Sequence, residues 1–238
     1  MSRTRVMAIV RKEFRDYRRN RYMLVTMAVI PVIFLLQPLI YILSLPPETA
    51  VPLSHKHELL YMLAIPALVP SIIAAASVVT ERQQGTLEPV LTTPIRREEF
   101  LLAKALAPLL PAVTVSYAVY GLFVVIIELF AHTGVASALL QAPVILAQVI
   151  FTPLLALWSI WVGIAISTRT SDIRAAQQLS VLGNLPLVAL STLIAFNVIQ
   201  PTLGLALAFG AALIVFDRLG WRVVSAMFDR ERLVTDTR

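Results

Sequence analysis

The chain has 238 residues, of which 58% are hydrophobic and only 14% are charged, and its mean hydropathy is +0.80. A soluble domain of this size cannot cover so much apolar surface, which makes the lipid bilayer the expected solvent. The net charge is +6, and in so apolar a chain we expect the basic residues to orient the spans rather than to bind nucleic acid. The chain has no Cys, which excludes disulfides and thiolate zinc sites.

The first 21 residues are predicted to form an amphipathic helix. Apolar residues recur at spacings of three and four, among many arginines, at Met7, Val10, Phe14 and Tyr17. Such a helix is expected to lie in the membrane interface, with its apolar stripe inward and its arginines among anionic lipid headgroups.

Six apolar segments follow, and we expect each to be a membrane span. A hydrocarbon core about 30 Å thick needs roughly 20 apolar residues in a helix. The expected spans are residues 22–45, 59–79, 105–130, 139–167, 179–199 and 203–216. The sequence therefore predicts an all-α, polytopic fold in which residues 1–238 form one transmembrane domain. A repeat of small residues in the last span, at Gly204, Ala208 and Ala212, predicts a packing face within the chain, with a dimer contact as the alternative.

The basic residues predict the orientation of these spans. Nineteen of the 20 Lys and Arg residues fall on one side of the expected bundle, and only Lys56 falls on the other. The positive-inside rule then places both termini, the segment 80–104 and the tail 217–238 in the cytoplasm.

The cytoplasmic segment 80–104 has the pattern of a helix, a break and a second helix. Gly85 can supply the break, and Thr93 followed by Pro94 is typical of a helix N-terminus. A small apolar patch at Leu87, Val90 and Leu91 favours a short helix that docks into a groove of another protein. A solvated loop would not need this patch.

This segment resembles the signature of a known family. The pattern Glu81-x-x-x-Gly85-Thr86-Leu87-Glu88, continued by Leu91, Thr93-Pro94, Glu99 and Lys104, is similar to that of ABC type-2 permeases, the membrane subunits of ATP-binding-cassette exporters. The basic N-terminal helix, the six spans and the run from Gln177 to Pro186 extend the resemblance over most of the chain. One departure is the short connection around Gln200-Pro201-Thr202, where many members have a large external loop.

The resemblance implies a permease in the plasma membrane, of prokaryotic type, that does no chemistry itself. ATP and Mg²⁺ would be bound by a separate cytoplasmic ATPase subunit, and a second copy or a paralogue would complete the membrane part. The residues expected to couple to the ATPase are Glu81, Gly85, Thr86, Leu87, Glu88 and Pro94. Asp172 and Arg174 form a possible second contact, although Arg174 can equally face lipid phosphates.

The residues themselves agree with a chain that carries no active site. No glycine precedes Lys12, Lys56 or Lys104, so a P-loop is absent. Only Glu128 is ionisable within the expected spans, which favours an apolar or amphiphilic cargo over a coupled proton. Two alternatives stay open: an intramembrane enzyme, for which only His55 and His57 offer a weak metal site, and a membrane partner through which an ATPase regulates or assembles something else.

Overall fold

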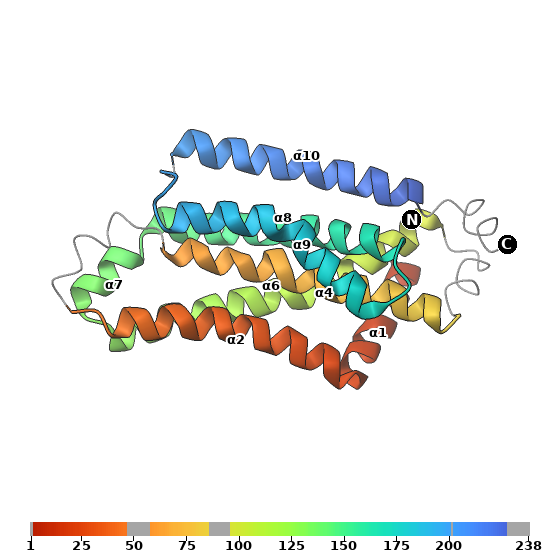
Figure 1. Cartoon of the computed structure of the whole chain (residues 1–238), viewed down its shortest axis with the longest axis horizontal. Helices are drawn as coiled ribbons and strands as arrows, with labels where there is room; N and C mark the ends of the chain where they lie inside the picture. Colours follow the sequence, from red (N-terminus) through yellow and green to blue (C-terminus); the bar gives the residue numbers. More distant parts are fainter. Residues whose placement is uncertain (1, 47–57, 86–95, 201, 228–238) are drawn as a thin grey trace.

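The computed structural model describes residues 2–46, 58–85, 96–200 and 202–227, which form a bundle of long helices (Figure 1). No strand occurs in this part of the chain. The elements are α1 (Arg3–Arg19), α2 (Arg21–Leu43), the 3₁₀ helix η2 (Glu58–Leu63), α4 (Ala64–Gln83), α6 (Arg97–Phe130), α7 (Thr133–Leu139), α8 (Ala142–Ser167), α9 (Ile173–Ala195) and α10 (Leu203–Met227). Six of these segments are long and apolar enough to cross a membrane, which confirms the all-α polytopic fold.

Helix α4 occupies the centre of the bundle. It packs against α2, α6, α8 and α9. In its most apolar 18-residue segment 94% of the residues are buried, compared with 12% in that of α2 and 11% in that of α10. Small side chains on α4, such as Ala74, Ala75 and Ala76, allow neighbouring helices to approach closely. At Gly163 of α8, an added Cβ would overlap the carbonyl oxygen of Ser71 in α4. These two helices are thus in backbone contact.

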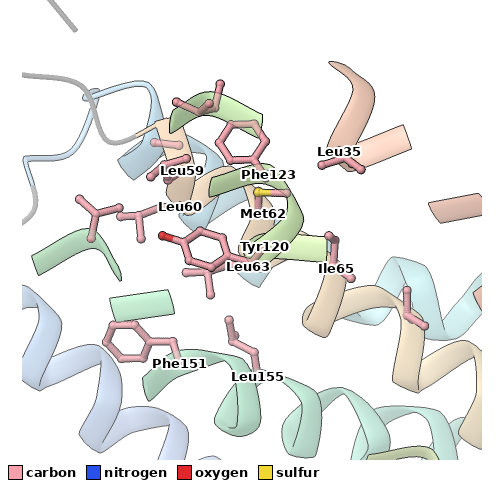
Figure 2. Packing of buried hydrophobic residues seen from close by; sticks show 14 of the residues in the cluster. Leu35, Leu59, Leu60, Met62, Leu63, Ile65, Tyr120, Phe123, Phe151 and Leu155 are labelled. Carbon is pink, nitrogen blue, oxygen red and sulfur yellow. The ribbon is translucent and has the colours of Figure 1, made fainter. Parts of the chain in front are cut away.

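Figure 2 shows the core near the end of the bundle opposite α1. Leucines of η2, including Leu59 and Leu63, pack with Phe123 of α6 and Leu155 of α8. All four of these side chains are at most 3% exposed. This cluster joins η2 to the helices around it, and it holds the start of the central helix in place.

Helix α10 lies at the edge of the bundle (Figure 1) and packs mainly on α8. Aromatic pairs form this contact, with ring centroids 5.3 Å apart for Trp158 and Phe216 and 5.6 Å apart for Trp161 and Trp221. A Cβ at Gly220 would lie 2.8 Å from Trp161. The prediction that Gly204 and Ala208 pack within the chain is wrong, because both are exposed and the close contact is made by Gly220 instead.

Several elements extend beyond the expected spans. Helix α9 starts at Ile173 because Asp172 caps it, with the Arg174 backbone N–H donating to Asp172 Oδ1 at 3.2 Å. Helix α10 continues to Met227, so residues 217–227 prolong the last helix rather than form a separate tail. The short helix α7 between α6 and α8 was not expected from the sequence.

Candidate functional site

The candidate site lies at one end of the bundle, which we call the basic end. Helix α1, the end of α4, the start of α6, the α8–α9 connection and the end of α10 all lie here, at the right of Figure 1. The structure thereby brings the end of α4, with Gly85 after it, against the connection before α9 in which Asp172 lies. Two stretches that the sequence predicted as separate contacts therefore form one surface.

Five side chains beneath this surface form a buried charge cluster: Lys12 and Glu13 of α1, Ser77 and Glu81 of α4, and Lys104 of α6. Lys104 Nζ lies 2.7 Å from both Glu13 Oε1 and Glu81 Oε2 and donates to Ser77 Oγ at 2.9 Å. The Ser77 hydroxyl donates to Glu13 Oε2 at 2.8 Å. Lys12 pairs with Glu81 Oε1 from the outer side.

The cluster is neutral as a whole, which allows its burial. The side chains of Lys104, Glu13 and Glu81 are only 2%, 4% and 7% exposed, whereas that of Lys12 is 45% exposed. A buried ion must be paired because leaving it unpaired costs several kcal/mol. One lysine between two carboxylates leaves a net negative charge, and Lys12 supplies the second positive charge at the solvent edge.

The pKa values of neighbouring groups follow from this arrangement. Partial burial lowers the pKa of Lys12, but its hydrogen bond to Glu81 and the charge of Glu81 outweigh burial and raise that pKa overall. Burial raises the pKa of Tyr17 well above its usual value, and the charge of Glu13 raises it further. Lys12 is therefore charged and Tyr17 neutral at physiological pH.

The buried face of α1 contains a glutamate, Glu13, among apolar residues. The buried residues are Val6, Val10, Glu13 and Tyr17, and Val6 and Val10 pack against Ala103 of α6. Of the expected apolar stripe, Val10 and Tyr17 are buried within the bundle, whereas Met7 is 41% exposed. The hydrophobic pattern of α1 does not reveal that Glu13 belongs to the buried face of this helix, where Glu13 contacts Lys104.

A second set of contacts fastens the end of α4 to the α8–α9 connection. Arg82 donates through Nη2 to the Thr168 carbonyl oxygen at 2.9 Å and through Nη1 to that of Thr170 at 3.4 Å. Gln83 Nε2 donates to the Ser171 carbonyl oxygen at 2.8 Å. Sequence reasoning missed both residues, because their acceptors are backbone carbonyls more than 80 positions away and leave no pattern.

Helix α4 ends where the sequence predicts a break. Gly85 has a φ of +65°, and its backbone N–H donates to the Arg82 carbonyl oxygen at 3.1 Å. This left-handed conformation is the one that glycine adopts without strain at helix ends. The chain therefore leaves α4 in a direction set by Gly85.

The remaining predicted site residues divide into two groups. Thr86, Leu87, Glu88 and Pro94 lie outside the described residues. Arg174 is exposed on the first turn of α9, whereas Glu81 is turned inward to Lys104 instead of outward to a partner protein.

The expected helix start at Thr93 and Pro94 lies outside the described residues. Helix α6 begins at Arg97, after Arg96 in an extended conformation. Glu99, which is 1% exposed, accepts hydrogen bonds from the backbone N–H groups of Arg96 and Ser2. It thus ties the first residues of the chain to the start of α6, a role that the sequence did not indicate.

A comparison with protein families matches residues 7–210 to the model described as "ABC-2 family transporter protein". This match runs from α1 into the first part of α10 and includes the whole buried charge cluster. A comparison with curated proteins gives no match.

Proposed function

Because the chain belongs to the ABC-2 transporter family, we propose that it is a permease subunit that exports an apolar or amphiphilic cargo. The energy would come from ATP hydrolysis in a separate cytoplasmic ATPase subunit that binds ATP and Mg²⁺. A second copy of this chain or a paralogue would complete the transmembrane part, in the plasma membrane of a prokaryotic cell.

The buried charge cluster is the observation that carries this proposal. The segment 86–95 connects the end of α4 with the start of α6, and Lys104 joins these two helices to α1 through Glu81 and Glu13. Three helices are thus fastened together at the end of the bundle where α4 ends and α6 begins. A displacement of the segment 86–95 would move them as a unit.

Helix α4 is suited to carry such a displacement through the membrane. It is the most buried of the spans and packs on four other transmembrane helices. Its end is also bonded to the α8–α9 connection through Arg82 and Gln83. A close-packed interior has few voids into which a helix could move alone. A shift of α4 would therefore displace α8 and α9 as well.

The residues predicted from the sequence to contact the ATPase therefore fall into two groups, those that would contact it directly and those that would act within the chain. Thr86, Leu87, Glu88 and Pro94 remain candidates for direct contact, and so does the exposed side chain of Arg174. Glu81 would act from within by fixing α4 against α1 and α6, and Asp172 by capping α9.

Substitutions in the coupling segment test the proposal. Gly85→Pro is incompatible with the observed φ of +65° and removes the N–H bonded to Arg82, and Glu88→Arg reverses a charge at the proposed contact. We expect both variants to insert into the membrane but to lose most cargo transport per ATP hydrolysed, in vesicles that contain the co-purified ATPase.

Glu98→Arg is the matched control, since Glu98 is an exposed glutamate on the first turn of α6. It should transport cargo as the unmodified chain does. Normal coupling in both Gly85→Pro and Glu88→Arg would contradict the proposal. An ATPase that co-purifies at near-equal stoichiometry while no cargo moves would instead favour a regulatory or assembly role.

A further inference from the structure

A groove of about 760 Å³ opens between α6, α8 and α10 near the basic end. Its walls are largely aliphatic, with Leu102, Leu106 and Leu109 from α6 and Leu154 and Leu157 from α8. Helix α10, which closes the third side, lies at the edge of the bundle (Figure 1). The groove is thus open to the lipid phase.

One carboxylate in this groove has no partner among the described residues. Asp217 is only 7% exposed, and neither of its carboxylate oxygens accepts a hydrogen bond. The indole N–H of Trp161, which also lines the groove, is buried without an acceptor. A buried carboxylate is costly unless a cation or a proton neutralises it, so Asp217 indicates a missing partner.

Two arginines complete the polar side of the groove. Arg218 and Arg222 both line it and are exposed, and guanidinium groups are well suited to bind phosphate. The groove therefore combines an aliphatic wall, a site that requires a cation and a site that favours a phosphate.

A zwitterionic phospholipid meets all three requirements, and one with a primary ammonium group can also donate hydrogen bonds to the carboxylate. A plain acyl chain would leave Asp217 unpaired, and an anionic phospholipid would satisfy only the arginines. We propose that the groove binds a phospholipid with a phosphoethanolamine headgroup. Its ammonium group donates to Asp217, its phosphate pairs with Arg218 and Arg222, and an acyl chain packs on the leucines.

The depth of Asp217 agrees with this occupant. The stretch from Leu203 to Asp217 rises about 21 Å at 1.5 Å per residue, within a hydrocarbon core of about 30 Å. Asp217 thus lies toward the headgroups of the basic side, and the long arginine side chains can reach these headgroups. This inference uses neither the ATPase nor the cargo, so it stands independently of the proposed function.

Lipid titration of the purified full-length chain, together with any subunit that accompanies it, tests the inference. After delipidation in mild detergent, native mass spectrometry would compare phosphatidylethanolamine, phosphatidylcholine and phosphatidylglycerol with identical acyl chains. We expect phosphatidylethanolamine to bind about tenfold more tightly than phosphatidylcholine, whose ammonium has no N–H to donate, in line with a charged hydrogen bond.

Variants assign the preference to the groove. Asp217→Asn should lower phosphatidylethanolamine affinity about tenfold and leave phosphatidylglycerol binding no weaker. Combined Arg218→Gln and Arg222→Gln should weaken both lipids. Glu128→Gln and Arg169→Gln, which change exposed residues outside the groove, are the matched controls and should bind like the unmodified chain.

Equal binding of the three lipids, or unchanged binding in Asp217→Asn, would overturn the inference and make Asp217 a protonated residue of the helix packing. A photoreactive phosphatidylethanolamine with a diazirine in its acyl chain provides a test that needs no variant. Cross-links should concentrate in residues 102–109 and 154–157; labelling spread evenly over the lipid-facing surface of α2 would equally argue against the site.

Discussion

At the scale of single residues, Lys104 is the centre of the basic end. It contacts two carboxylates and a hydroxyl from two other helices, and its side chain is 2% exposed. Removing it would leave Glu13 buried with no positive charge nearer than Lys12, whose nitrogen lies 3.9 Å away. The structural contribution of Lys104 is therefore larger than its single charge suggests.

Lys104→Met tests this contribution. We expect it to lower the free energy of unfolding by about 3–5 kcal/mol, because it breaks a buried ion pair and leaves a carboxylate uncompensated. Unfolding by SDS in mixed micelles would measure the change. A double substitution with Glu13→Gln should recover part of the loss, since it removes the uncompensated charge.

Lys12→Met is the matched control for Lys104→Met. Lys12 is 45% exposed, so solvent screens its ion pair and the expected loss is smaller than that for Lys104→Met. Because its pKa is raised, this contribution is fully present below the ordinary lysine pKa and disappears only as the pH rises through the raised value. Equal losses for the two lysine variants would show that burial does not set the strength of the cluster.

At the scale of elements, the contact between α4 and α8 determines how closely the bundle can pack. Gly163 permits this contact, because a side chain there would meet the backbone of Ser71 rather than a movable group. Backbone cannot shift without moving the whole helix. The position of α8 therefore depends on one glycine.

Gly163→Ala should separate α4 from α8 and lower the free energy of unfolding by about 1–3 kcal/mol, the usual cost of overpacking. Gly121→Ala is the control, because Gly121 lies within α6 and a Cβ there meets nothing within 4 Å. It should be neutral or stabilise the chain by up to about 1 kcal/mol through helix propensity. Similar destabilisation of both variants in the same unfolding experiment would contradict this account.

At the scale of the whole molecule, the orientation of the bundle decides which surface an ATPase can reach. The basic end carries α1, the end of α4 and the start of α9 (Figure 1), and α7 lies at the other end. The distribution of Lys and Arg predicts that the basic end is cytoplasmic.

Two cysteine variants test this orientation in a chain that has no Cys of its own. Ser137 in α7 and Ser171 before α9 are both exposed serines. In intact cells, a membrane-impermeant maleimide should label Ser137→Cys but should reach Ser171→Cys only after lysis. The reverse pattern would place the basic end outside and remove the ATPase contact from the proposal.

The all-α class, the number and order of the apolar spans and the break at Gly85 could be predicted from the amino-acid sequence alone. These features are local: a span needs only a sufficient run of apolar residues, and a left-handed helix end favours glycine. The cap that Asp172 provides for α9 is also a local feature. The family resemblance extended this prediction to a membrane subunit, and the family match confirmed it.

Helix packing, in contrast, determines which helix is central, where Glu81 points and which face of α1 is buried. Helices α2 and α4 show the reason. Their most apolar segments have almost equal mean hydropathies, 2.3 for α2 and 2.2 for α4, but 12% of the α2 segment is buried and 94% of the α4 segment. Lipid and protein interior are both apolar, so hydropathy cannot distinguish a lipid-facing helix from a buried one. The pairing of Glu13, Glu81 and Lys104 joins three distant segments, and it therefore exists only once the helices are packed.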